Sequence, residues 1–389
     1  MRHLRVGAIV LLVAYGMATE GSAAELLEGL RTSGAFTGIL QGTIGNPKQF
    51  RGDRPQGTLS TDLFVETPVV STPDSVSLFF VNVGIQKGRG LTPGDSLPTL
   101  FKSPNGQFTG PNNDVQNFRE ENAVNFKEAR YEYHHFEGGI RQFRFVVGQL
   151  DLTKDFDTNQ FANDQAFQFL GQIFNNNIAI DFGGQANFFG PGIVANYYPT
   201  PFVGLSAGYY QGEGLFEDLL NHPFMIVEGD VRVRPFGLLG NYRAYAWERD
   251  TLHRTQQDLT VFRSRNRGVG LSFDQKVSGS IGVWTRLGVQ DARVSQFDKS
   301  GSVGVEWVGP LESRPNDVWG SGYGVTVGGP QYRARTGLNE SEHYLETYYR
   351  IVTHKNFQVS PDLQYIINPG GNGAERSVLM YGVRLHVNF

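Results

Sequence analysis

The sequence predicts an all-β protein: a transmembrane antiparallel β-barrel of about 16 strands. Three observations support this prediction. The chain opens with an export signal, and no later apolar run reaches the roughly 18 residues that a membrane-spanning helix needs. Short segments alternate apolar and polar residues, which is the pattern of strands with one apolar and one polar face. The polar faces carry acids and bases together, as expected for a wet lumen.

The first 24 residues have the features of a removable export signal. Arg2 and Arg5 give a basic start, and residues 6–18 form an apolar run. This run is too short to cross about 30 Å of hydrocarbon as a helix. The small residues at 21–24 offer a cleavage site, so we expect the mature chain to begin at Glu25.

Composition narrows the class further. The chain has 49 Gly, 29 Phe, 16 Tyr and no Cys, so disulfides and thiolate metal sites are excluded. The formal net charge of −4 gives no basic excess for binding nucleic acid. No composition break divides the mature chain, and we expect one barrel domain over 25–389, with a short periplasmic segment at 25–36. Stretches rich in Pro, Gly and Asn at 88–122 and 311–341 have the composition of long loops.

The C-terminal stretch VLMYGVRLHVNF shows the alternation most clearly. Apolar residues stand at every second position from Leu379 to the aromatic Phe389. The same pattern recurs over 127–135, 141–147, 225–235, 343–351 and 357–367. A soluble β-sandwich would give similar alternation. The mixed charges on the polar faces, and the Tyr and Phe on the apolar ones, favour the membrane barrel.

Three motifs have ordinary explanations. Residues 204–208 match the G-x-S-x-G elbow around Ser206, but a strand end and a loop follow where an elbow requires a helix. Residues 155–159 begin like a calcium loop, yet its sixth and twelfth positions lack the required Gly and Glu. His134 and His135 would point to opposite faces of a strand, leaving one lumen histidine near Glu132. We therefore expect no metal and no cofactor.

Four segments resemble the carbohydrate-selective porins of the OprB family. They are GQLDLTKDFDTNQFANDQAFQFLGQIFNNNIAI (148–180), NRGVGLSFDQKVSGSIGVWTRLG (266–288), VGVEWVGPLESRPNDVWGSGYG with its Gly-Pro-x-x-x-Arg-x-x-Asp core (303–324), and the final strands with Pro-Asp-x-Gln-Tyr-x-x-Asn-Pro-Gly-Gly (340–389). The resemblance implies a 16-stranded outer-membrane porin that admits sugars by diffusion through a constriction narrowed by inward loops. Family members often open with a Trp-Gly-Gly segment, which residues 26–40 lack.

The polar faces supply the candidates for lining the pore and contacting solute. Charges of both signs cancel much of the field while offering donors and acceptors to hydroxyl groups, and tyrosines could stack on sugar rings. The alternative is that these charges pair with one another and stiffen the wall. The candidates are Glu128, Arg130, Glu132, Arg144, Glu228, Asp230, Arg232, Arg234, Tyr344, Glu346, Tyr348 and Arg350.

The function expected from these observations is passive, carbohydrate-selective diffusion of sugars and small hydrophilic solutes across the outer membrane of a Gram-negative cell. The expected partners are sugars, outer-membrane lipid and lipopolysaccharide, and the barrel-assembly machinery, which would read the terminal Phe389. A general or anion-preferring porin is an alternative. A barrel lipid hydrolase acting through Ser206 and a plugged structural barrel without conductance are further alternatives.

Overall fold

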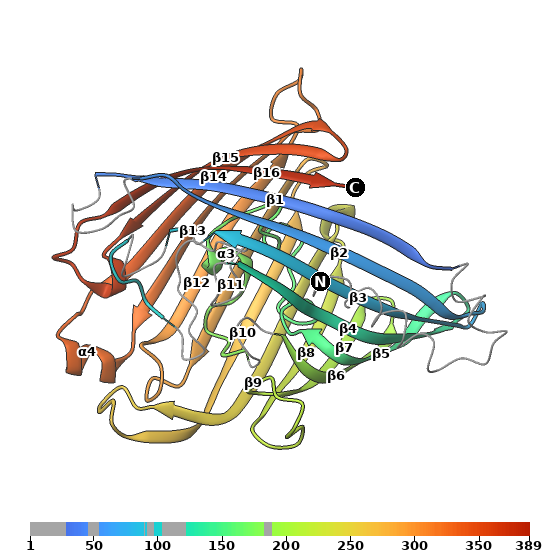
Figure 1. Cartoon of the computed structure of the whole chain (residues 1–389), viewed down its shortest axis with the longest axis horizontal. Helices are drawn as coiled ribbons and strands as arrows, with labels where there is room; N and C mark the ends of the chain where they lie inside the picture. The colour runs from blue at the N-terminus through green and yellow to red at the C-terminus, as the bar shows by residue number, and fades with distance from the viewer. Residues whose placement is uncertain (1–28, 46–53, 89, 92–96, 103–121, 183–188) are drawn as a thin grey trace, which may run out of the picture.

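The computed structural model describes residues 29–45, 54–88, 90–91, 97–102, 122–182 and 189–389. The expected export signal lies outside these residues. The described strands form one closed antiparallel barrel in which each strand pairs with its sequence neighbours and β1 pairs with β16 (Figure 1). The predicted barrel and its strand number are confirmed. Within the part of the chain described, no helix is long and apolar enough to cross a membrane.

The strands follow the chain around the barrel in sequence order. Their bounds are β1 Arg31–Ile44, β2 Gln56–Ser71, β3 Ser75–Gly88, β4 Asn122–Glu137, β5 Ile140–Asp151, β6 Phe189–Thr200, β7 Val203–Gln211, β8 Pro223–Val233, β9 Gly240–Arg254, β10 Phe262–Lys276, β11 Ile281–Gln290, β12 Phe297–Val308, β13 Val318–Gly328, β14 Ser341–His354, β15 Phe357–Ile367 and β16 Val378–Asn388. Short helices α3 Gln172–Asn175 and α4 Pro330–Thr336 lie in the connections after β5 and β13.

The connections differ at the two ends of the barrel. Short turns follow the even-numbered strands, whereas longer segments such as 89–121 and 152–188 follow the odd-numbered ones. In barrels of this kind the short turns face the periplasm and the long loops face outward. The chain's last residue lies at the short-turn end, where Phe389 and Gly34 exchange two backbone hydrogen bonds of 2.8 and 2.9 Å. The last strand is therefore paired to its end.

Two expected boundaries need correction. β1 begins at Arg31 and pairs with β2 from there, so the segment expected at 25–36 includes six strand residues. Residues 25–28 lie outside the described chain. The stretch 311–341 is not a continuous loop, because it contains β13 and α4. Its glycines are compatible with a strand because their inner faces are covered, as described below.

The alternation predicted along the wall is confirmed. In β16, Met380, Arg384 and His386 face the interior and are buried, whereas Val383 faces outward with 45% of its surface exposed. In β14, Tyr344, Glu346 and Tyr348 are likewise buried on the inner side. An apolar outer face and a polar inner face are what a barrel in lipid requires.

Candidate functional site: a constriction inside the barrel

Residues 152–182 belong to the connection between β5 and β6, and we call them the inward segment. They fold into the barrel lumen and do not project from its long-loop end. β5 ends at Asp151, and β6 resumes opposite it at Phe189, so the chain leaves and rejoins the wall at neighbouring positions. Figure 1 shows α3, part of this segment, within the outline of the strands. The segment's aromatic side chains, among them Phe156, Phe161, Phe169 and Phe174, are buried.

Arg286 on β11 holds the start and middle of the inward segment. Its Nε lies 2.9 Å from Asp157 Oδ2, and its Nη1 donates to the carbonyl oxygens of Ala162 and Phe174 at 2.5 Å each. Its Nη2 also donates to the side chain of Asn163 at 2.9 Å. Arg286 is only 1% exposed. A buried guanidinium is tolerated only when it is paired and hydrogen-bonded, so this site specifies the path of the segment.

Two further charges of the wall bind the segment's backbone. Glu346 on β14 accepts hydrogen bonds from the N–H groups of Leu170 and Gly171, the latter at 2.7 Å. Arg384 on β16 donates to the carbonyl oxygens of Gln165 and Gln168, the latter at 2.8 Å. These lumen charges satisfy backbone groups that would otherwise be buried without partners.

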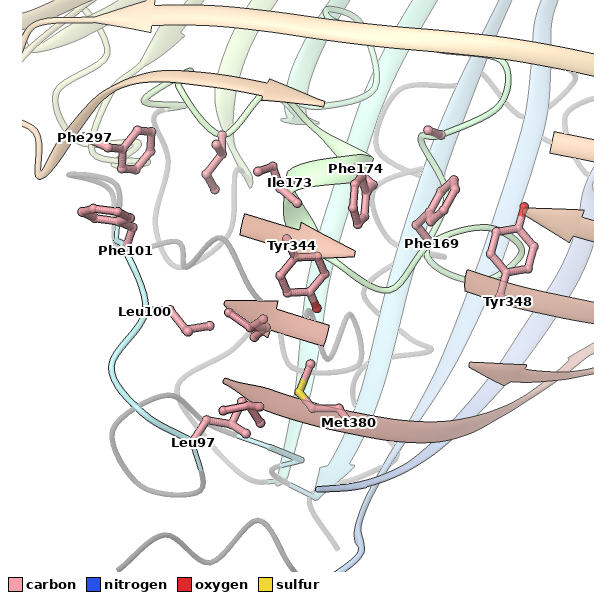
Figure 2. Packing of buried hydrophobic residues seen from close by; sticks show 14 of the residues in the cluster. Leu97, Leu100, Phe101, Phe169, Ile173, Phe174, Phe297, Tyr344, Tyr348 and Met380 are labelled. Carbon is pink, nitrogen blue, oxygen red and sulfur yellow. The ribbon is translucent and has the colours of Figure 1, made fainter. Parts of the chain in front are cut away.

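Aromatic packing anchors the same part of the segment (Figure 2). Phe169 packs edge-on against Tyr348, with ring centroids 5.1 Å apart. It packs in the same way against Trp284, at 5.4 Å. Phe174 lies 5.5 Å from Tyr344 by the same measure. The loop residues Leu97, Leu100 and Phe101 extend this buried cluster toward the outward end.

Glycines on the inner wall make room for these side chains. A Cβ on Gly322 would lie 3.0 Å from Phe174, and one on Gly324 would lie 2.8 Å from Ile173. On β11, a Cβ on Gly282 would meet the Phe161 ring at 2.2 Å. Glycine within a strand often marks a close approach by another part of the chain.

The other side of the inward segment faces an open cavity of about 630 Å³, which we call the eyelet. Its opposite wall comes from β2, β3 and β4. Charged residues of both signs line it in equal number, three acids and three bases, together with eight amides and three phenylalanines. The lining residues are Asp62, Asp151, Asp164, Lys127, Lys154, Arg350, Asn82, Asn159, Gln160, Asn163, Gln165, Gln168, Gln172, Asn176, Phe64, Phe167 and Phe189, with Thr153.

A β-bulge places one of these bases in the eyelet. The register between β3 and β4 shifts at Asn82, so no residue of β3 stands opposite Lys127 in the sheet. Both Lys127 and the next residue, Glu128, are buried. Lys127 Nζ lies 2.7 Å from Asp62 Oδ1 across the lumen side of the sheet. Bulges commonly redirect a side chain in this way.

A second cavity of about 230 Å³ lies nearer the short turns, and we call it the basic pocket. Five bases and three acids line it: Arg141, Arg144, Lys154, Arg232, Arg243, Asp155, Glu228 and Asp230. Arg141 and Arg232 lie over the Tyr198 ring at 4.8 and 5.7 Å. Lys154 lines both cavities. Burial alone would lower the pKa of Lys154, but Glu128 and Asp151 raise it above its ordinary value, so the ammonium remains charged.

Four of the predicted residues form one ion-pair network beside these cavities. Arg130 lies 2.6 Å from Glu128 and 3.4 Å from Glu132, and Arg144 lies 2.6 Å from Glu132. Arg144 also reaches Asp155 of the inward segment at 2.6 Å. The network therefore links the barrel wall to the inward segment. It agrees with the alternative that the lumen charges pair with one another.

The other predicted residues fall into four places. Glu228, Asp230 and Arg232 line the basic pocket, and Arg350 lines the eyelet. Tyr344, Glu346 and Tyr348 point inward, but the inward segment covers them, and each is at most 2% exposed. Arg234 lies just beyond β8 in an exposed turn and lines neither cavity. Contact of any of them with solute stays a prediction.

Sequence reasoning missed most of the eyelet. Phe167 and all the amides but Asn82 come from the inward segment, and Asp62 comes from a strand whose alternation was not singled out. Lys127 begins the stretch 127–135, whose alternation was recognised, but it was not among the candidates. One signal was available: the stretch from Asn159 to Asn177 is unusually rich in Asn and Gln. Such a run is too polar for a lipid-facing element.

Two of the three motifs with ordinary explanations, Ser206 and the pair of histidines, can now be placed. Ser206 lies inside β7, where its Oγ accepts a hydrogen bond from Asn196 at 2.7 Å. His134 Nε2 lies 2.9 Å from Glu132, as expected, while His135 is exposed. Among the described residues, no three His, Asp or Glu side chains are grouped so that they could hold a metal ion.

Comparisons with known proteins agree with this architecture. Residues 227–389 match the family model described as carbohydrate-selective porin, OprB family. The chain is 24% identical over 236 residues to Porin AaxA of Chlamydia abortus, covering 59% of this chain and 50% of that protein. It is 23% identical over 201 residues to Porin B of Pseudomonas aeruginosa, covering 47% and 40% respectively. The aligned part thus spans about half the length, or less, of these curated relatives.

Solved structures extend the likeness to the whole barrel. The high-pH structure of Pseudomonas putida OprB superimposes with a TM-score of 0.73 at 17% identity, covering 95% of this chain and 96% of that one. The outer-membrane channel DcaP of Acinetobacter baumannii superimposes with a TM-score of 0.56 at 14% identity, covering 92% and 97%. The fold is the closed antiparallel barrel of these solved channels, and residues 227–389 match the model of the carbohydrate-selective porin, OprB family.

Proposed function

We propose that the protein is a passive outer-membrane pore through which sugars and similar neutral, hydroxyl-rich solutes diffuse. The observation that carries this proposal is the lining of the eyelet, where the formal charges cancel and amides predominate. Rings of charge of one sign would select ions. Amide side chains offer both donors and acceptors, so they can bind a hydroxyl group that donates or one that accepts a hydrogen bond.

Aromatic groups add a second feature suited to sugars. Phe167 lies in the eyelet, with its ring centroid 4.4 Å from that of His386 and 5.6 Å from the Arg350 guanidinium. These contacts hold the ring in place from the wall side. A fixed apolar ring among amides gives the C–H face of a sugar a surface to pack against while its hydroxyls bond to the amides.

The basic pocket supports a second candidate, an anion-preferring pore. Its five bases and three acids would raise the local concentration of anions at the short-turn end. Several of these charges are already paired, since Arg243 lies 2.8 Å from Asp274 and Arg144 lies 2.6 Å from Asp155. The pairing reduces the field available to a passing anion, so we favour the sugar pore.

The proposed pore needs no cofactor and performs no chemistry. Ser206 is part of the barrel wall, where its Oγ accepts a hydrogen bond from the Asn196 side chain. Processing of the export signal after residue 24, recognition of Phe389 by the assembly machinery and contact with lipopolysaccharide belong to the same proposal. The family and fold support an outer-membrane location.

Solute flux tests the proposal directly. Refolded mature protein in liposomes should give faster swelling with glucose and disaccharides than with organic anions or amino acids of matched size. Equal rates would indicate a general diffusion pore, and faster anion entry would favour the second candidate. Absence of flux through a correctly folded barrel would mean that the inward segment closes the lumen.

A further inference from the structure

The outer wall has a broad apolar depression that the pore does not use. A cavity of about 1140 Å³ extends across strands β5 to β12. Small residues form its floor, because outward positions on four neighbouring strands, β6 to β9, are alanine or glycine. They are Ala195, Ala207, Gly229, Ala244 and Ala246. Larger apolar residues that are about half exposed border it, including Leu205, Val227, Val269 and Leu287. We call this depression the outer groove.

A second outer cavity, of about 660 Å³, adjoins the groove toward the long-loop end. The two share Val227, Ala246, Val269 and Val289. One outward position further along β9 and β10, Glu248 and Arg267 are paired in register, and Asp291 and Arg293 lie beyond them. The lining therefore changes from apolar to charged where the barrel approaches the outer surface of the membrane.

Cations lie on both sides of the place where the lining changes from apolar to charged. Arg267 on β10 and Lys299 on β12 are exposed, and Lys299 stands opposite Val289 on the groove's edge. Arg263 is exposed on the same strand as Arg267. The acids nearby are Glu248, Asp250, Asp291 and Asp298.

Some of these charges are already paired and some are not. Arg265 lies 3.8 Å from both Glu248 and Asp250, and Arg293 is paired with Asp291. In the described chain, Arg267 and Lys299 have no ion pair. A cation on the lipid-facing side is costly unless it lies at the interface with an anionic partner.

We propose that the outer groove binds a phosphorylated, multiply acylated lipid of the outer leaflet. Its acyl chains would fill the groove, and its phosphate groups would lie on Arg267 and Lys299. The two cations are two strands apart, about 10 Å, so a head group with more than one phosphate can reach both. This inference rests on the proposed outer-membrane location, but it is independent of what crosses the lumen.

A second copy of the chain fits the same surface less well. A two-fold interface places the same patch on both subunits. Centred on the groove, it would set Lys299 at the β12 edge of one copy against the β5 and β6 edge of the other, where the groove is lined by Phe143, Ala195, Asn196 and Tyr197 and offers no acid. An anionic lipid neutralises the cations and also fills the apolar floor.

Binding of defined lipids tests the charge part of the proposal. The full mature protein in an uncharged detergent would be titrated with bisphosphorylated hexa-acyl lipid A and with its dephosphorylated form, and read by native mass spectrometry. Loss of two basic contacts in the double variant Arg267→Gln/Lys299→Gln should weaken binding of the phosphorylated form about 30-fold. The control Lys87→Gln removes an exposed cation at the long-loop end of β3 and should leave binding unchanged. Equal affinity of wild type and double variant, or of the two lipid forms, would overturn the proposal.

Filling the floor tests the apolar part. The variant Ala207→Phe/Ala246→Phe should bind both lipid forms at least tenfold more weakly, whereas Val383→Phe on the outer face of β16 should not. Folding of each variant is checked by strand circular dichroism and by heat-modifiable gel mobility. If the wild type is a dimer that the filled variant converts to a monomer, the groove is a contact between copies and the lipid proposal is wrong.

Discussion

Arg286 on the wall and Asp157 on the inward segment form an ion pair of 2.9 Å in which both side chains are almost completely buried. Because the two residues are 129 positions apart in sequence, the pair fixes the segment across the lumen. Replacing Arg286 by Met would leave Asp157 without its cation and would free the carbonyls of Ala162 and Phe174. We expect a loss of about 3–5 kcal/mol in the free energy of unfolding.

The same change should alter the pore. With the segment released, single-channel conductance in planar bilayers should rise or fluctuate between levels, and discrimination among solutes should fall. Arg234→Met, in an exposed turn, serves as the matched control and should preserve both stability and conductance. Wild-type conductance in Arg286→Met would show that the segment is held without this pair.

Charge balance in the eyelet gives the second prediction. Arg350→Glu changes the formal charge of its lining from zero to −2. The pore should then prefer cations, as a shift of the reversal potential in a potassium chloride gradient would show. Arg234→Glu makes the same change in charge outside both cavities. If both variants shift the reversal potential equally, the eyelet is not the selective part of the path.

Acid should loosen the inward segment near its end. Burial alone would raise the pKa of Asp181, but Arg249, His253 and Asn266 lower it below its ordinary value. Those groups contact its carboxylate at 2.8, 2.7 and 3.1 Å. A lowered folded-state pKa means that this stabilisation is complete above the ordinary aspartate pKa of about 3.9 and is lost as pH falls toward the folded value.

The measurement is proteolytic sensitivity of the inward segment between about pH 6 and pH 3. Wild-type protein should become more sensitive toward the acid end. Asp181→Asn should be more sensitive than wild type at neutral pH and should change less on acidification. Parallel pH profiles for the two proteins would contradict the assignment to Asp181.

Glycines under the inward segment should tolerate no side chain. In Gly282→Ala the new Cβ would meet the buried Phe161 ring at 2.2 Å, so we expect a loss of about 1–3 kcal/mol in the free energy of unfolding. Gly229→Ala makes the same substitution where a Cβ would have no neighbour within 4 Å, on the outer wall. Thermal unfolding of the two variants should differ clearly, and equal melting temperatures would argue against tight packing at Gly282.

Turn chemistry at the end of β12 provides a further prediction. Asp317 accepts from Arg314 at 2.8 Å, from the Tyr349 hydroxyl at 3.0 Å and from the Val352 N–H at 2.9 Å. Asp317→Ala leaves these donors without their acceptor, which should cost about 1–3 kcal/mol. The neighbouring acid Glu312→Ala, in the same turn but outside this set of bonds, is the control in urea unfolding.

Much of the wall could be predicted from the sequence because strand alternation is local. The inner and outer faces of β14 and β16 follow from neighbouring residues alone. The Gly-Pro-x-x-x-Arg-x-x-Asp core has a local cause too, since Gly309 adopts φ +66° and Arg314 bonds to Asp317 three residues on. The turn is thus built within a few residues.

The contents of the lumen could not be predicted in the same way. Glu346 and Arg384 have the pattern of pore-lining charges, yet they bind the backbone near Leu170 and Gln168. Their sequence separation from these partners exceeds 170 residues. Alternation tells which side a residue faces, but the path of a loop decides whether water or protein meets it there.

The inward segment packs mainly against the inner faces of β7 to β14 and of β16, whereas β2 and β3 lie across the eyelet from it. The barrel wall therefore divides into a large part that holds the inward segment and a small part, β2 and β3, whose side chains line the eyelet opposite it. Substitution of Asp62, Phe64 or Asn82 should therefore change the lining of the eyelet without disturbing the contacts that anchor the segment. Strand β4 belongs to both parts, because its Glu128 pairs with Lys154 of the segment. In this plan the lining of the eyelet can change while the anchoring contacts, and the stability that comes with them, stay the same.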